Sequence, residues 1–315
     1  MSVVHNFVLW LFVLLILSGA TATDKLSAKK VVMEYLVNLP GQGILAGQEE
    51  NNSSSDSQME KLIRITGKSP ALRGFETAAY SKDPMAEAIK SWKNGQLVTF
   101  GYHMGAPPLS DDEFNHSKGT SDITNCLTPG TDEYASFNEK LAQMATRLEG
   151  LRDKGIPVLW RPFHEMDGTW FWWSKEGCEP YKKLWVYMYD YFTETMKLNN
   201  LIWVWSASYE PESCWYPGDE YVDIIGSDVY LKKRDNDRWT EIFNQLKKME
   251  SNKPVALTEN DLIPHPEVLI ERDLNYIWFL TWHSRWLDSN EPAFLKMVYQ
   301  HDYVITADEL PDFSK

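Results

Sequence analysis

The chain has 315 residues, a formal net charge of −14 and 14 tryptophans. Such an acidic surface repels nucleic acid and anionic lipid, and it suits a neutral polymer. Carbohydrate binding would account for the excess of tryptophan, because indole faces stack on sugar rings.

An apolar run opens the chain, from Phe7 to Leu17, and the small residues Ala20, Thr21 and Ala22 follow it. This pattern predicts a secretory signal peptide over residues 1–22, cleaved after Ala22. A membrane anchor is the alternative, but a span needs roughly 20 apolar residues. We therefore expect a secreted, extracellular protein that has no membrane contact after cleavage and folds as one domain over residues 23–315.

Short apolar runs alternate with helical stretches along the rest of the chain, which is typical of a parallel α/β fold. A doubly wound open sheet would carry a glycine-rich phosphate turn after its first strand, and ILAGQEENNSSS has none. The sequence therefore predicts a single (β/α)8 TIM barrel. Its predicted strands are Gly43 to Gln48, Leu72 to Glu76, Leu97 to His103, Pro157 to His164, Leu201 to Ser206, Val222 to Tyr230, Pro254 to Glu259 and Tyr276 to His283.

Two of the helical stretches have apolar residues at helical spacing, which we expect to face the core. Thr131 or Asp132 is the predicted N-cap of the first, and Gly155 follows its end. The two stripes are Phe137, Leu141, Met144, Leu148 and Leu151, then Tyr181, Leu184, Trp185, Met188 and Phe192.

Three cysteines in an exported chain predict one disulfide and one remaining thiol. Cys178 and Cys214 fall in successive strand-to-helix loops on one face of the predicted barrel. They are the favoured pair, which leaves Cys126 free.

The stretch LWRPFHEMDGTWFWWS carries the clearest chemical signal. His164 and Glu165 stand where the fourth strand should end, and tryptophans follow in a loop. A carboxyl group partly removed from water can act as a general acid near neutral pH. The alternative is an internal ion pair of Glu165 with Arg161. A zinc protease helix is excluded because Gly168 stands where the second histidine would be, and we expect no metal or other cofactor.

A second carboxyl group, Glu259, closes the seventh strand in VALTEN. Strands four and seven of one barrel can direct both carboxyl groups into the same mouth. Retaining glycosidases hold two carboxyls about 5 to 5.5 Å apart and inverting ones about 6.5 to 9.5 Å, and sequence spacing leaves both open. Arg161 and Tyr230 are the candidate donors that would keep Glu259 ionised.

RPFHEM followed by WFWW, together with VTFGYH, YPGDEYVDIIGSDVY and VALTE, resembles the family 26 glycoside hydrolases. Most members of that family are retaining endo-β-1,4-mannanases built on a (β/α)8 barrel. The resemblance implies that Glu165 is the acid/base and Glu259 the nucleophile. A minority of the family act on β-1,3-xylan or mixed-linkage glucan, which stays an open alternative.

The remaining candidates are substrate-binding residues at strand ends and in the loop after strand four. The resemblance implies sugar contacts by His103 and His164, a tyrosine near the nucleophile at Tyr230, and a sugar platform at Trp282. The full predicted binding set is His103, Arg161, His164, Trp170, Trp173, Asp228, Tyr230 and Trp282. Within it, Trp170 and Trp173 would flank the cleft and Asp228 would orient other groups. Trp185 and Trp203 are expected in the core, and Trp172 in either place.

We expect a monomer, and the resemblance implies that its partner is β-mannan polysaccharide or oligosaccharide. A catalytically silent carbohydrate-binding barrel is the competing hypothesis. It would keep the tryptophans but would have no need of both strand-end glutamates, so we favour the enzyme.

Overall fold

The computed structural model describes residues 27–50, 58–77, 83–108, 111–250 and 252–313. Within these ranges, parallel strands β1 to β8 form a closed barrel, because β1 pairs with both β2 and β8. The fold is the predicted (β/α)8 barrel. Its strands are β1 Ile44–Glu49, β2 Leu72–Glu76, β3 Leu97–Tyr102, β4 Val158–Pro162, β5 Leu201–Ala207, β6 Ile224–Val229, β7 Val255–Asn260 and β8 Tyr276–Thr281.

Each predicted strand is present, with its ends within two residues of the expected ones. The largest differences at the carboxyl ends are in β4, which ends at Pro162 rather than at His164, and in β8, which ends at Thr281 rather than at His283. His164 and His283 both line a hollow at that end of the barrel. The chain therefore leaves the sheet where its side chains begin to form a site.

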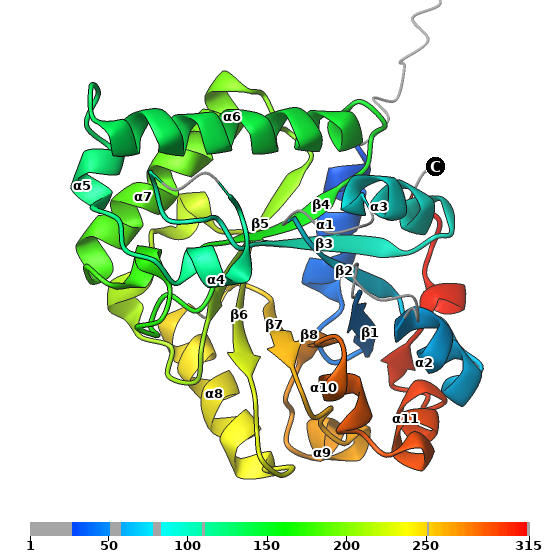
Figure 1. Cartoon of the computed structure of the whole chain (residues 1–315). Helices are drawn as coiled ribbons and strands as arrows, with labels where there is room; N and C mark the ends of the chain where they lie inside the picture. The colour runs from blue at the N-terminus through cyan, green and yellow to red at the C-terminus, as the bar shows by residue number, and fades with distance from the viewer. Residues whose placement is uncertain (1–26, 51–57, 78–82, 109–110, 251, 314–315) are drawn as a thin grey trace, which may run out of the picture.

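Helices surround the barrel on its outer side (Figure 1). They are α1 Ala28–Asn38, α2 Gln58–Thr66, α3 Pro84–Lys93, α4 Phe114–Ser117, α5 Ile123–Cys126, α6 Asp132–Arg152, α7 Cys178–Asp190, α8 Asn236–Met249, α9 Pro266–Glu271, α10 Arg285–Asp288 and α11 Pro292–Tyr299. A two-residue strand, β9 (Val304–Ile305), adds to β1 outside the barrel.

The longest helix, α6, begins and packs as its sequence predicts. Thr131 is the N-cap, and its hydroxyl accepts a hydrogen bond from the Tyr134 backbone N–H at 3.1 Å. This bond satisfies one of the free N–H groups at the helix start. Every residue of the two predicted apolar stripes is buried, and so are Trp185, Trp203 and Trp172.

The amino ends of the strands are filled by aliphatic side chains. Leu72, Leu97 and Leu159 pack there with Val32 and Leu36 of α1 in one buried cluster. This apolar end contrasts with the carboxyl end, where the buried residues include several charged ones. The difference places the chemistry at the carboxyl end, as in other barrels of this type.

Cys178, at the start of α7, and Cys214 form a disulfide with Cα atoms 5.7 Å apart. Cys126 is a buried free thiol, and burial raises its pKa to about 11. No helix among the described residues has the length and apolar character needed to cross a bilayer. The predicted signal peptide, residues 1–22, lies outside the described residues.

Candidate active site

A hollow of about 590 Å³ opens at the carboxyl ends of the strands. Six of the predicted site residues line it, from β3, β4, β6, β7 and β8 or the loops that follow them: His103, His164, Glu165, Tyr230, Glu259 and Trp282. The barrel thus brings together residues that are far apart in sequence.

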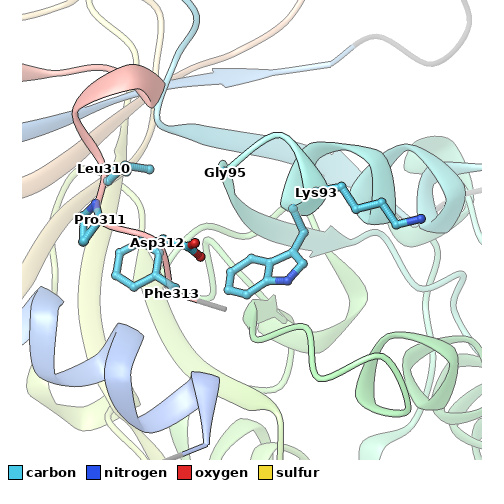
Figure 2. A pocket seen from close by; sticks show the side chains of 7 residues that line it. Lys93, Gly95, Leu310, Pro311, Asp312 and Phe313 are labelled. Atoms are coloured by element: carbon cyan, nitrogen blue, oxygen red, sulfur yellow. The ribbon is translucent and has the colours of Figure 1, made fainter. Parts of the chain in front are cut away.

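A second hollow, of about 450 Å³, lies beside the start of β3, between Lys93, Gly95 and the segment from Leu310 to Phe313 (Figure 2). Among the residues that line it, Asp312 carries the one carboxyl group. Because an acid and a nucleophile need two such groups, this hollow does not fit the predicted chemistry.

The backbone after β4 adopts an unusual conformation that turns Glu165 into the hollow. Phe163 and Glu165 have φ values of 47° and 54°, in the left-handed region that residues other than glycine rarely occupy. Several hydrogen bonds hold this turn, including the following two. The Glu165 N–H donates to the Ser206 carbonyl at 2.8 Å, and the Trp173 indole donates to the His164 carbonyl at 2.9 Å. Strain of this kind is often found at functional sites.

Glu165 is half-buried and contacts an indole. The Trp170 Nε1–H donates to Glu165 Oε2 at 2.7 Å. Burial, reinforced by the negative charge of Asp228, raises the pKa of Glu165 to about 8. A carboxyl group with this pKa is protonated at neutral pH and can donate a proton.

Glu259 has a different environment at the end of β7. Arg161 contacts Glu259 Oε1 at 2.5 Å, and the Tyr230 hydroxyl donates to Oε2 at 2.5 Å. Burial raises the pKa of Glu259 well above its usual range, and the charge of Arg161 and the hydrogen bond from Tyr230 oppose this shift. Both oxygens of this carboxylate are held by donors, which orients the carboxylate and stabilises its ionised form against the effect of burial.

Asp228 supports Arg161 from the opposite side. It accepts from Arg161 at 3.1 Å and from the Ser206 hydroxyl at 2.7 Å. The β6–β7 register shifts between Ser227 and Asp228, so that Asp228 stands opposite Glu259. Arg161 therefore bridges two carboxylates, as an orienting ion pair would require.

Two histidines lie side by side in the hollow, His103 and His164, with ring centroids 4.6 Å apart. Glu76 contacts His103 Nδ1 at 2.7 Å. Burial acts to raise the pKa of Glu76, but the contact with His103 and the charges of Arg161 and His283 together outweigh burial, and the pKa is lowered. Burial and the charge of Arg161 lower the pKa of His164 well below its usual range, so this ring is neutral and can exchange hydrogen bonds with hydroxyl groups.

Four of the predicted binding residues, Arg161, Trp170, Trp173 and Asp228, do not line the hollow. Trp173 is fully buried and stacks on Phe171 with ring centroids 4.5 Å apart, so the expectation that it flanks the cleft is wrong. Arg161 and Asp228 lie beneath the hollow and contact Glu259 and each other instead of open space. Trp170 is 37% exposed and lines a neighbouring hollow of about 360 Å³, and its indole contacts Glu165 at the edge of the site.

Sequence reasoning missed several residues that line the hollow. Glu76 ends β2 and could have been found as a strand-end carboxyl group, like Glu259. The others lie in short helices and loops, where no periodic pattern marks them. The missed residues are Glu76, Phe114, Phe171, Tyr209, His283, Arg285 and Trp286.

One group of side chains has the spacing of a metal site. Ligand atoms of His164, Asp228 and Glu259 lie within 4.8 Å of one another. The guanidinium of Arg161 contacts both carboxylates of this group and supplies the positive charge that a cation would bring. The two carboxylates therefore already have a positive partner in Arg161, and the group does not need a metal ion.

A closed parallel barrel with two glutamates at strand ends in one hollow is the arrangement described for glycoside hydrolases of the barrel type. The family model of glycosyl hydrolase family 26 matches residues 21–309. The chain belongs to this family.

Named relatives agree with this assignment. A mannan endo-1,4-beta-mannosidase of Thermothelomyces thermophilus is 33% identical over 306 residues, which cover 90% of this chain and 61% of the relative. The match thus spans about three fifths of that protein's length. GH26A from Muricauda sp. MAR_2010_75 has a TM-score of 0.80 and 34% identity, with coverage of 92% and 99% of the two chains.

A third match is a structure with a bound sugar. The beta-mannanase from a symbiotic protist of the termite Reticulitermes speratus, complexed with gluco-manno-oligosaccharide, has a TM-score of 0.82 and 30% identity. The alignment covers 92% of this chain and 96% of that one. The similarity therefore extends over nearly the whole barrel.

Proposed function

We propose that this protein is a secreted, retaining endo-β-1,4-mannanase that hydrolyses internal bonds of mannan, glucomannan or galactomannan. The observation that carries the proposal is the opposite environment of two glutamates in one hollow. Glu165 is half-buried under an indole and has a pKa of about 8, whereas Glu259 contacts a guanidinium. A glycosidase needs one protonated and one ionised carboxyl group at the same pH.

The first chemical step forms a glycosyl-enzyme. Glu259 attacks the anomeric carbon while Glu165 donates its proton to the departing glycosidic oxygen. Arg161 and Tyr230 hold the two oxygens of Glu259 and so orient the nucleophile. His103 and His164, which line the hollow, are placed to bond the ring hydroxyls, where contacts strengthen in the transition state.

The second step releases the sugar. Glu165, now ionised, takes a proton from water, and the resulting hydroxide attacks the anomeric carbon as the bond to Glu259 breaks. Glu165 then carries its proton again and the cycle is complete. Two inversions at the same carbon leave the product with the configuration of the substrate.

Mannan is the proposed polymer because of the named relatives. The Thermothelomyces protein is named for action on mannan, and the termite-symbiont structure is complexed with gluco-manno-oligosaccharide. Trp282 lines the hollow and can support a sugar ring, as aromatic faces do. Action on β-1,3-xylan or mixed-linkage glucan is the competing proposal. We further propose export through residues 1–22 and a monomer of residues 23–315.

Reducing-sugar release from soluble β-mannan, β-1,3-xylan and barley β-glucan tests the substrate, with a Glu165→Ala/Glu259→Ala double variant as the blank. Release from mannan, with products that keep the β-configuration by NMR at early times, is the expected result. Sugar release from only one of the other polymers would show that mannan is not the substrate. First products with the α-configuration would overturn the retaining mechanism.

A further inference from the structure

Trp170 has a contact that a simple sugar platform does not need. Its indole N–H donates to Glu165 Oε2 at 2.7 Å. An indole nitrogen is a donor only, so the oxygen that it contacts must act as an acceptor. When Glu165 is protonated, its proton is therefore favoured on the other oxygen, Oε1.

Gly168 lets the indole reach this position. A Cβ atom at residue 168 would lie 2.4 Å from Cη2 and Cζ2 of Trp170, far inside normal contact distance. The six-membered ring of the indole thus lies directly against the glycine backbone. Because Trp170 is 37% exposed, a side chain at position 168 would push the indole away from Glu165 rather than distort the core.

The turn that carries Gly168 is fixed to the barrel. The Gly168 N–H donates to the Glu165 carbonyl at 3.0 Å, and Asp167 Oδ1 accepts from the Ser208 N–H at 2.7 Å. Trp170 also contacts Phe171 edge to face, with ring centroids 6.3 Å apart. The indole is therefore held over Glu165 before any substrate binds.

We propose that Trp170, seated on Gly168, is a positioning residue that directs the proton of Glu165 to Oε1 and stabilises the Glu165 anion. In the first step the proton leaves Oε1 for the glycosidic oxygen as the C–O bond breaks. In the second step the anion, still bonded to the indole N–H, takes a proton from water. The indole keeps its own proton throughout. This inference rests on the proposed function of Glu165.

The Trp170→Phe variant tests the proposal because it keeps an aromatic ring but removes the donor. Loss of a hydrogen bond to the anion should move the basic limb of the kcat/KM profile up by about one pH unit. At neutral pH, kcat/KM for β-1,4-mannopentaose should fall about tenfold. For dinitrophenyl β-mannobioside, whose leaving group needs no proton, kcat/KM should change less than about twofold.

The Gly168→Ala variant should break the same Trp170–Glu165 hydrogen bond without changing Trp170, because the added Cβ would displace the indole. It should lower kcat/KM for mannopentaose by about the same factor while leaving Trp170 in the chain. Combined with Trp170→Phe it should have little further effect, because the donor is already gone. Gly150→Ala in α6 is the matched control, since a Cβ there meets nothing within 4 Å, and it should behave as wild type.

Three results would overturn the proposal. One is an unmoved basic limb in Trp170→Phe with a change in KM alone, which would make Trp170 a sugar platform only. A second is a double variant whose loss in kcat/KM equals the product of the losses in Gly168→Ala and Trp170→Phe. The third is an equal loss on both substrates. If wild type itself cleaves neither mannan nor mannopentaose, the proposed function fails instead, and thermal unfolding curves identify variants that do not fold.

Discussion

The ends of β4 and β7 present the same side chain in opposite surroundings. Glu259 lies within strand β7, and a guanidinium and a phenol contact its two oxygens. Glu165 lies three residues beyond its strand, at φ 54°, under an indole, and no ion pair of Glu165 is present in the described part of the chain. The difference shows how one residue type can supply both an anion and an acid, because the environment sets each protonation state.

Removing each glutamate in turn is the strongest test of this comparison. Glu259→Ala should lower kcat on mannan by about 10⁴-fold or more, since covalent chemistry is lost. Glu165→Ala should cost about 10² to 10⁴-fold on mannan, the usual range for a general acid, and far less on dinitrophenyl β-mannobioside.

Azide distinguishes the two roles by the product that it forms. With Glu259→Ala, direct attack by azide should give the α-mannosyl azide. With Glu165→Ala, azide should attack the glycosyl-enzyme and give the β-azide. NMR of the products decides the assignment, and the opposite pair of configurations would exchange the roles of the two residues.

Arg161 contacts Glu259 at the end of β7 and has no counterpart beside Glu165 among the described residues. Its replacement should therefore have the next largest effect. Arg161→Met leaves Asp228 and Glu259 buried without a counter-charge, which should reduce the free energy of unfolding by about 3–5 kcal/mol. Activity should fall together with stability. Urea unfolding and kcat on mannan measure the two effects.

Tyr230→Phe is the matched control, because it removes one hydrogen bond from Glu259 and leaves the ion pair in place. A loss of about 1.5–3 kcal/mol in transition-state stabilisation, roughly 10- to 160-fold in rate, is expected with a smaller effect on folding. Equal destabilisation by both variants would contradict the central role of the ion pair.

The pH dependence of kcat/KM tests the protonation state of Glu165, which follows β4. Glu165 donates only when protonated, so kcat/KM should be maintained at lower pH and should fall as pH rises through about 8, the pKa of this carboxyl group. The acidic limb should report ionisation of Glu259. A basic limb near pH 5 would mean that Glu165 is not the acid.

The fold was predictable because its signals are repeated along the chain. Eight apolar runs separated by periodic helices define a parallel barrel, and a polar residue at the end of a strand then points to the mouth. His103, Glu165, Tyr230 and Glu259 were predicted in this way and line one hollow. Glu76 carries the same signal at the end of β2.

The remainder of the site depends on side-chain directions that a sequence does not encode locally. Trp170 and Trp173 are three residues apart in one aromatic run, yet one is 37% exposed over Glu165 and the other is fully buried. Strain at Phe163 and Glu165 decides which way this loop turns, and the contacts that hold it come from distant residues such as Ser206 and Tyr181. Arg285 and Trp286 likewise lie in a short helix that only tertiary packing places at the hollow.

The smallest expected effect is on stability, and it follows from the same raised pKa. Between the ordinary pKa of glutamate, near 4.5, and about 8, folded Glu165 holds a proton that the unfolded chain releases. The free energy of unfolding should therefore decrease as pH rises through this window.

The Glu165→Gln variant tests this pH dependence. Its side chain stays neutral and its amide oxygen still accepts from Trp170, so its Tm should exceed that of wild type by a few degrees at pH 8 and by less at pH 5. Glu194→Gln, whose side chain is 73% exposed, should show no such difference. If the Tm of Glu165→Gln exceeded that of wild type by the same amount at both pH values, the gain would come from packing. The stability of the β4 end would then be independent of the protonation state of Glu165, on which the proposed chemistry depends.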